Sequence, residues 1–473
     1  IMIGYRAGKV KTGHSSISIG YEAGLNSRSG NMIAIGRDSA RGVGYHYAQG
    51  VVIGYQAGTR IASGSTAVVT AVGWRAGHQM SGSNDFFGYS AGYGSVSSAP
   101  YGSGQQNVGI GTNALYNLST GNYNTAVGRS AGQSITVGNE NVAIGQEALL
   151  SATGTLSTVV IGMQAGYNIN STDANRTVLI GYTAGRSLTS GQGNVAIGAE
   201  ALRTEDTGDF NTAIGHQALY TQNRDGTVSN TAVGYKAGYA VTTGYEATLV
   251  GANAGVSLTD GIQNTLIGGN VADSLTTGDY NTAVGARALQ SEDVGRGTTA
   301  IGYNALNAQN SDSNDEETGN VAVGYEAGKS VTTGTDNTII GYKAAHVMTT
   351  PDDMTVVGKE ALITQQGGMS GRGTHIGYRA GFRQNLTSGV DGNISIGYTA
   401  NFSNVTGGAN ISIGYAAGYG VANHSPGNNI NIGYAASQYI STGYQNVVIG
   451  HAAFENAKSG SINVIIGQEA GRY

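Results

Sequence analysis

The chain contains no cysteine, three prolines and one tryptophan among its 473 residues. Without cysteine it has no disulfide scaffold, no thiol nucleophile and no thiolate metal site. Charged residues make up only 11% of the chain, and 24 basic against 29 acidic side chains give a net charge of −5. This balance is too neutral and too mixed for binding nucleic acid by electrostatics. The sequence also lacks a run of about 18 apolar residues, so we expect no membrane insertion.

Glycine, in contrast, is abundant, with 79 residues, or about 17% of the chain against roughly 7% in an average protein. The glycines follow no Gly-X-Y period and proline is scarce, which excludes collagen. Hydrophobic residues reach 39%, enough for a packed core. The chain begins at Ile1 inside a repeat and shows no signal peptide, so we interpret it as a segment or processed form of a longer protein.

One phrase recurs from end to end, Asn-Thr-Ala-Val-Gly or Asn-Val-Ala-Ile-Gly, followed after two residues by Ala-Gly or Ala-Leu. Its glycine, which we call the anchor glycine, occurs 27 times between Gly4 and Gly467. The commonest interval between successive anchors is about 17 residues, a length typical of one solenoid coil. The widest intervals run from Gly88 to Gly111 and from Gly302 to Gly324, and neither has room for a separate domain. Residues 1–473 are therefore predicted to form one continuous repeat array with small insertions near 93–106 and 307–319.

We number positions from the anchor glycine, with negative numbers toward the N-terminus. Position −1 is Ile or Val in every copy but Phe87, and position −3 is Ile, Val or Thr in every copy but Asp85. The two positions share one face of a strand, where β-branched side chains pack well. We therefore expect them to form the core of each coil. The predicted buried column includes Ile144, Ile197, Ile214, Val284 and Ile449.

Three further positions describe the rest of the repeat. Position +3 is Ala in 25 copies, which indicates a tightly packed place. Asn fills position −4 in 16 copies, where its amide can form a ladder with the next coil. Glycine is frequent at position −7, next to Asp, Asn or Thr, as in turns. A strand, a glycine bend, a short second strand and a turn, repeated about every 17 residues, predict an all-β parallel β-solenoid (β-roll) of about 27 coils.

Position −2 has the opposite parity to the predicted core pair, yet it is apolar in 21 of 27 copies. Apolar residues on both faces are typical of strands buried on both sides. Because a single coil of this length is too thin to bury both faces, we expect the second face to pack against identical chains. The residues expected at this contact are Val160, Leu179, Leu249, Leu266, Ile339, Val448 and Ile465.

The repeat carries a resemblance to known proteins. Asn-Val-Ala-Ile-Gly at 141–145 and 194–198 and Asn-Val-Ala-Val-Gly at 320–324 resemble the head repeats of trimeric autotransporter adhesins. Residues 121–128 and 208–220 are similar to repeats in bacteriophage tail fibres. The resemblance covers essentially the whole chain and implies a parallel β-roll in which three chains bundle as a homotrimer.

The adhesin repeat is usually shorter, and the 473 residues contain neither the neck nor the coiled-coil stalk of those adhesins. We therefore expect an extracellular, non-enzymatic shaft of a phage tail fibre that supports host-surface attachment, with other fibre or virion proteins at its ends. The alternative is a bacterial trimeric surface adhesin that binds matrix or glycans. In both cases a host-surface glycan or protein is an expected partner, and nucleic acid is not. An ice-binding solenoid is the third hypothesis, although its Thr column would share parity with the predicted core.

Motifs for chemistry are few, and we predict no catalytic set, no cofactor and no metal site. Residues 324–330 lack one residue of a phosphate loop, and the eight histidines have no metal-ligand spacing. The nearest approach to a calcium site is an acidic insertion, for which a solvated loop is the other interpretation. Its carboxylates are Asp312, Asp315, Glu316 and Glu317.

Position +1 is Tyr in 13 copies and Trp once. An exposed stripe of this kind can contact sugars or a surface through rigid aromatic rings. The other interpretation is a structural ladder in which the rings cover the glycine bend and stack coil upon coil. The candidate residues are Tyr5, Tyr55, Trp74, Tyr182, Tyr235, Tyr303, Tyr342, Tyr398, Tyr415 and Tyr434.

Overall fold

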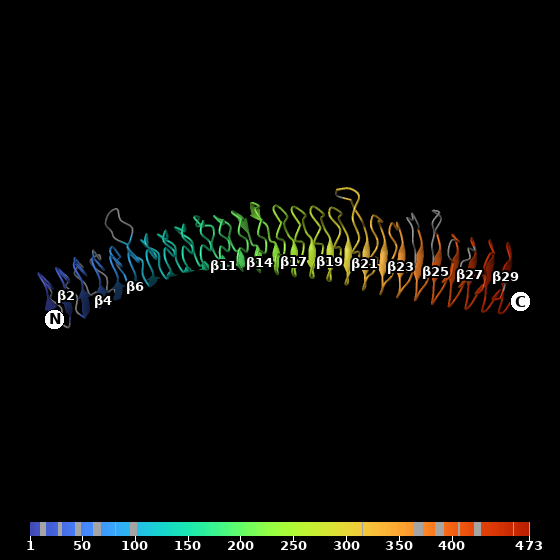
Figure 1. Cartoon of the computed structure of the whole chain (residues 1–473), viewed down its shortest axis with the longest axis horizontal. Coiled ribbons are helices and arrows are strands. Elements are labelled where there is room, and N and C mark those ends of the chain that lie inside the picture. Colours follow the sequence, from blue (N-terminus) through green and yellow to red (C-terminus); the bar gives the residue numbers. More distant parts are fainter. Residues whose placement is uncertain are drawn as a thin grey trace. The chain divides into compact units, whose positions relative to one another are not determined.

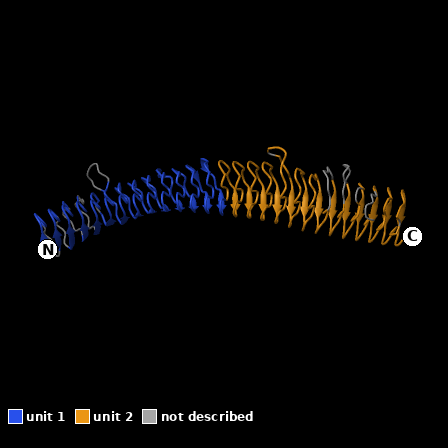
Figure 2. Ribbon diagram, in the orientation of Figure 1, with its two compact units in different colours: residues 1–236 blue, residues 237–473 orange. Residues whose placement is uncertain are grey.

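The computed structural model of the chain describes residues 1–9, 16–26, 31–42, 49–59, 68–80, 82–94, 102–314, 316–363, 372–383, 392–404, 407–420, 427–456 and 458–472. The chain divides into two compact units, residues 1–236 and 237–473 (Figure 2). These described ranges contain strands, turns and bends but no helix. Within them, accordingly, there is no helical segment of the length and apolar character needed to cross a membrane.

Unit 1 is a parallel β-solenoid in which strands follow one another in chain order (Figure 1). Each main strand ends directly before an anchor glycine and pairs in register with the strand of the next coil, as Val159 does with Val178. A separate pair is formed by β13 and β15. The strands are β1 (Met2–Ile3), β2 (Ile17–Ile19), β3 (Met32–Ile35), β4 (Gln49–Ile53), β5 (Val68–Val72), β6 (Asn84–Phe87), β7 (Asn107–Ile110), β8 (Thr125–Val127), β9 (Val142–Ile144), β10 (Val159–Ile161), β11 (Val178–Ile180), β12 (Val195–Ile197), β13 (Gly208–Asp209), β14 (Thr212–Ile214), β15 (Gly226–Thr227) and β16 (Thr231–Val233).

Unit 2 repeats the same parallel arrangement, and its register is equally constant, with Thr248 opposite Thr265 and Thr265 opposite Thr282. Its strands are β17 (Thr248–Val250), β18 (Thr265–Ile267), β19 (Thr282–Val284), β20 (Thr299–Ile301), β21 (Val321–Val323), β22 (Thr338–Ile340), β23 (Thr355–Val357), β24 (Thr374–Ile376), β25 (Ile394–Ile396), β26 (Ile411–Ile413), β27 (Ile430–Ile432), β28 (Val447–Ile449) and β29 (Val464–Ile466).

The predicted all-β parallel solenoid, with one strand per repeat of the sequence, is confirmed. The short second strand expected in each coil is wrong, because the described residues after the anchor form turns. These turns still bond to the next coil, as when the Gly185 N–H donates to the Ala201 carbonyl over 2.9 Å. In the predicted insertions, residues 95–101 and Asp315 lie outside the described residues.

The predicted direction of the strand faces is wrong. Position −2 points into the coil, and Val160, Leu179 and Leu249 are fully buried. Ile339 and Val448 are buried as well, Leu266 is fully buried, and Ile465 packs against the core. Positions −1 and −3 point outward, so Ile144 and Ile214 are 37% and 36% exposed. Ile197, Val284 and Ile449 are half-buried on the same outward face.

The narrow interior explains this reversal, because it selects side chains by fit rather than by uniform β-branching. Where position −2 is large, position +4 is often Gly: a Cβ on Gly185 would lie 2.7 Å from the Leu179 side chain. Where position −2 is Ala, position +4 is often Leu, as in the fully buried pair Ala196 and Leu202. Size is thus exchanged between the two positions, which keeps the interior close-packed. The uniform Ile and Val residues instead form the outer surface of the sheet.

Two predicted packing features are confirmed. The Ala residues at position +3, such as Ala184 and Ala201, are fully buried. The Asn residues at position −4 form a ladder: the Asn141 backbone and side-chain N–H groups donate to the Asn124 Oδ1 over 3.1 and 2.9 Å. The Asn124 side chain donates in turn to the Gly138 carbonyl over 2.8 Å. These bonds satisfy buried polar groups at the corner of successive coils.

The anchor glycine is required by both conformation and space. Gly181 has a φ of 142°, and a Cβ there would lie 2.3 Å from the Gly198 carbonyl oxygen of the next coil. A side chain would therefore collide with backbone that cannot move independently. The strand must turn at this glycine, which places position +1 on the surface directly after the bend.

Candidate functional site

The predicted Tyr column is exposed, and its rings stack from coil to coil; contact of this column with sugars or a surface stays a prediction. Its rings are mostly 41% to 62% exposed, while Tyr55 and Trp74 are half-buried. Tyr398 and Tyr415 stack with ring centroids 5.0 Å apart, and Trp74 and Tyr89 with centroids 4.5 Å apart. Stacked partners within each unit also include Tyr5 with Tyr21, Tyr55 with Trp74, His216 with Tyr235, Tyr303 with Tyr325, Tyr325 with Tyr342, Tyr378 with Tyr398, Tyr415 with Tyr434 and Tyr434 with His451.

Stacking decides which part of each ring is available to a ligand. Inside a stack the ring faces cover one another, so the ring edges and phenol groups are what the surface presents. Tyr182 differs from the stacked rings because its neighbours in the column are Met163 and Ala199. A sugar that needs an open aromatic face therefore finds little of it inside the stacked parts of the ladder.

The sequence reasoning missed a second aromatic column at position +5. His78, Tyr93 and Tyr116 stack with successive centroid distances of 4.9 Å. In unit 2, Phe382, Phe402 and Tyr419 do the same, also at 4.9 Å. The signal was present, since aromatic residues occupy position +5 in consecutive repeats. Position +2 lies between the two columns: the Arg379 guanidinium lies 5.1 Å from the Tyr378 ring centre and 4.9 Å from that of Phe382.

A charged cluster beside the ladder was also missed. The nearly buried carboxylate of Glu326 accepts from Lys329 over 3.2 Å, contacts His346 Nε2 at 3.1 Å, and lies 3.5 Å from Lys343 Nζ. Burial alone would raise the pKa of Glu326, but the nearby cation Lys329 and the His346 ring outweigh it, so the pKa is lowered. Burial lowers the pKa of His346 in spite of the carboxylate. The cluster thus holds an ionised carboxylate and a neutral imidazole at pH 7.

The acidic insertion does not gather its carboxylates. A Glu316 carboxylate oxygen accepts from the Asp312 backbone N–H over 3.0 Å, while Glu317, which is well exposed, lies 3.9 Å from the Arg296 guanidinium. Asp315 lies outside the described residues. Across the described part of the chain, no three His, Cys, Asp or Glu side chains are grouped so that they could hold a metal ion.

Two buried carboxylates occur where other repeats have apolar residues. Glu205 Oε1 accepts from the backbone N–H groups of Asp206, Thr207 and Gly208 over 3.0, 3.2 and 2.7 Å. Burial raises the pKa of Glu205 against these bonds. Glu292 accepts from the Gly295 N–H over 2.7 Å in the same way. Each also accepts from the next coil, Glu205 from the Arg224 N–H over 3.4 Å and Glu292 from the Ser311 N–H and hydroxyl over 3.2 Å, so both side chains act as structural caps.

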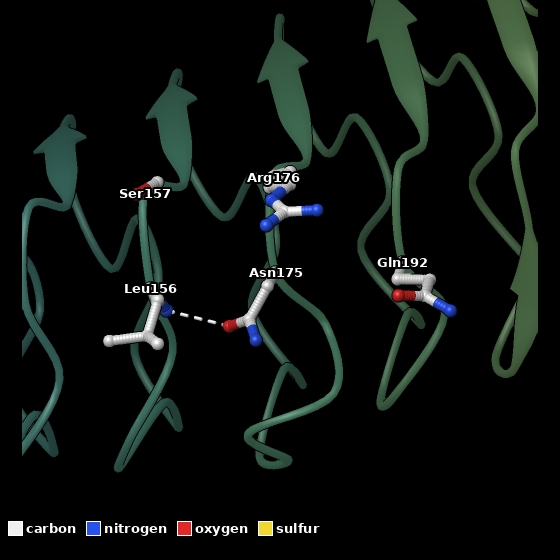
Figure 3. A pocket seen from close by; sticks show the side chains of 5 residues that line it. All are labelled: Leu156, Ser157, Asn175, Arg176 and Gln192. Atoms are coloured by element: carbon white, nitrogen blue, oxygen red, sulfur yellow. Dashed lines mark hydrogen bonds between the residues drawn. The ribbon is translucent and has the colours of Figure 1, made fainter.

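A surface hollow of about 280 Å³ lies in unit 1 between the coils of β10, β11 and β12. It is lined by Leu156, Ser157, Asn175, Arg176 and Gln192, which come from three successive coils (Figure 3). Asn175 Oδ1 accepts from the Leu156 N–H over 2.7 Å, and Ser157 donates to Glu140 over 3.0 Å. These groups can hydrogen-bond a polar ligand, but they include no paired acid and base.

Unit 2 has a polar stretch inside its core. Position −2 is His375, Ser395, Ser412 and Asn431 in the coils of β24 to β27, and all four are buried. Neither ring nitrogen of His375 has a hydrogen-bond partner. Burial lowers the pKa of His375 to about 3, so the imidazole is neutral in the folded chain.

The buried His375 should make the stability of the folded chain sensitive to acid. Its pKa is about 3 when folded and about 6.5 in an unfolded chain, so its contribution to stability is complete above 6.5 and falls as the pH drops toward 3. Between about pH 7 and pH 5 the free energy of unfolding of the unmodified chain should fall by roughly 2 kcal/mol more than that of a His375→Ser chain. Urea unfolding of both chains at the two pH values measures this difference. An equal loss in both chains would contradict the assignment.

Comparison with known proteins adds no relative, since no family model, curated protein or solved structure matches the chain.

Proposed function

We propose that the chain is a non-enzymatic structural segment, the trimeric extracellular shaft of a phage tail fibre. In this role three chains pack their outward strand faces together. Other fibre or virion proteins bind at the ends, and a distal tip contacts the host surface. The shaft itself performs no chemistry and needs no cofactor.

The observation that carries the proposal is the outward face of the sheet. Ile267, Ile301 and Ile340 stand in one column of unit 2, and their side chains are 37% to 38% exposed. Position −3 adds Thr, Val and Ile beside them in every described strand of that unit. A two-column apolar face of this length exceeds what a monomer normally leaves in water. Lateral packing against further copies covers it.

The number three rests on the resemblance to adhesin heads and phage fibres and on the symmetry of a shaft. Chains that surround a common axis must be equivalent, and each contributes the same face to the interior. A bacterial trimeric adhesin that binds matrix or glycans would use the same packing, so the two functions differ in where the chain is located rather than in its fold.

Ice binding is a further candidate because the Thr column is outward, contrary to the expectation from sequence. Thr248, Thr265, Thr282 and Thr299 stand in register and half-buried on the sheet surface. The column beside them is Ile or Val rather than Thr, and Val321 ends the run. The shaft accounts for both columns, whereas ice binding accounts for one. Thermal hysteresis in a solution of the folded chain would favour ice binding.

Immunogold electron microscopy tests the shaft function. Antibodies raised against the purified chain should label fibres between the phage particle and the fibre tips. Label confined to the surface of uninfected bacterial cells would contradict the shaft and support the adhesin.

A further inference from the structure

In each unit, one cation interrupts the Tyr column and lies between two aromatic rings. The Arg37 guanidinium is 5.5 Å from the centre of the Tyr21 ring and 5.9 Å from that of Tyr55. The Lys359 Nζ is 5.6 Å from the centre of the Tyr342 ring and 6.0 Å from that of Tyr378. A cation over an aromatic face is held by the ring quadrupole and keeps its charge. The same arrangement is therefore built twice.

Further cations surround each of these two and stand above recessed carboxylates. In unit 1 the Arg6 and Arg41 side chains are 44% and 50% exposed, whereas the Glu22 carboxylate that both contact is 5% exposed. In unit 2 the Lys329 and Lys343 side chains are 35% and 32% exposed above Glu326, which is 10% exposed. A ligand at this surface meets the positive groups first. The surface is thus locally basic on a chain of net charge −5.

We define two strips by the residues that form them. Strip 1 consists of Arg6, Arg37, Arg41 and Arg75 with Tyr21 and Tyr55, and strip 2 of Lys329, Lys343, Lys359 and Arg379 with Tyr342 and Tyr378. Beside strip 1 a hollow of about 320 Å³ is lined by Asp38, Arg41, Gly42, Gln56, Thr59 and His78. Its lining is polar, and the Arg41 guanidinium pairs there with the Asp38 carboxylate over 3.1 Å, so the hollow suits a hydroxylated ligand rather than an apolar one.

We propose that strips 1 and 2 are binding sites for an acidic polysaccharide, whose carboxylates pair with the exposed cations while its hydroxyl groups bond the phenol edges. Successive coils are about 4.8 Å apart, close to the length of one sugar residue in an extended polysaccharide. In strip 2, Lys343, Lys359 and Arg379 lie on successive coils and can therefore meet charges on neighbouring sugars. In strip 1, Arg6, Arg37 and Arg75 lie on alternate coils and can meet charges on every second sugar. This binding is independent of the shaft function.

The chemistry of the strips separates this ligand from two others. A neutral sugar binds aromatic residues through an open ring face, and here neighbouring rings and cations occupy those faces. A single-stranded nucleic acid needs the same faces to stack its bases. A carboxylated polysaccharide needs only the cations and the ring edges.

Binding of the full chain to immobilised polygalacturonate, a polyuronate, tests the proposal, with neutral dextran and a polynucleotide of equal length as comparison ligands. We expect binding to polygalacturonate that weakens about tenfold or more between about 50 and about 300 mM NaCl, because ion pairs dominate it. Dextran should not bind, and the polynucleotide should bind more weakly. Equal binding to dextran, or tighter binding to the polynucleotide, would overturn the proposal.

Variants locate the binding. Arg37→Tyr combined with Lys359→Tyr completes both Tyr columns and removes the two central cations, so affinity should fall about tenfold while the melting temperature stays unchanged. Arg37→Lys with Lys359→Arg keeps the charges and should keep the affinity. Arg129→Tyr is the matched control, because Arg129 occupies the same column outside both strips and pairs with Glu147 over 2.7 Å. Unchanged affinity in the double Tyr variant, or an equal loss in the Arg129 control, would refute the sites.

Discussion

A Leu179→Asp chain is expected to lose roughly 4 kcal/mol or more of stability in the coils around β11. Leu179 is fully buried, lies between Val160 and Ala196 of the neighbouring strands, and fills the space left by Gly185. A carboxylate at this place would be buried without a partner. Because each coil contacts mainly its neighbours, the loss should appear first as faster amide hydrogen exchange in β10 to β12.

The matched control is Ile180→Asp, one residue further along the same strand. Ile180 is half-buried on the outward face, so its carboxylate can reach water in a single chain. Exchange in β10 to β12 should then stay close to that of the unmodified chain once the copies are separated. If Ile180→Asp unfolds these coils and Leu179→Asp leaves them intact, the assignment of inner and outer faces is wrong.

Three lysines on the outward face should separate the chains of the proposed trimer without unfolding them. In the variant that combines Ile267→Lys, Ile301→Lys and Ile340→Lys, each new charge would have to be buried at the contact between chains, which costs several kcal/mol per ion. Covering about 50 Å² of each isoleucine contributes only roughly 1 kcal/mol, so packing cannot offset the charge. Light scattering should report single chains, and far-UV circular dichroism should keep its strand signal.

Lysines on the Tyr ladder provide the control for this variant. Tyr303→Lys, Tyr342→Lys and Tyr415→Lys add the same charge at side chains of similar exposure, between 41% and 47%. The ladder lies beyond the anchor bend, on the turn that follows the strand. The control chain should keep the mass of the unmodified protein, and its dissociation would show that added charge alone separates the copies.

The sequence predicted the architecture because its repeat is local and regular. An anchor glycine at a nearly constant interval, with β-branched residues before it, can form only a short strand followed by a bend, and the Asn at position −4 can bond only to the coil beside it. The direction of the faces did not follow from the pattern, since both parities are apolar. The side-chain sizes at positions −2 and +4 are complementary: Leu179 is paired with Gly185, and Ala196 with Leu202. This relation identifies the inner face only once it is known that the chain folds back and brings the two positions together.

The candidate surface was predicted in part. The column of tyrosines at position +1 was evident from spacing alone, but its stacking depends on parallel register, which brings Tyr398 and Tyr415 face to face. The second column at position +5 and the placement of cations above Glu22 and Glu326 arise from the turn after the anchor. Residues at position +2 there have positive φ, such as Lys343 at 54°, and this conformation directs side chains in a way that periodicity does not encode.

The molar mass of the unmodified full chain in dilute solution, measured by light scattering, tests the central claim most directly. The proposed homotrimer, in which the outward faces pack about a common axis, predicts about 144 kDa, three times the chain mass of 48.0 kDa. A soluble, folded chain of 48.0 kDa would contradict the account, because the Ile and Val columns would then be stable in water, and a dimer would contradict the threefold arrangement.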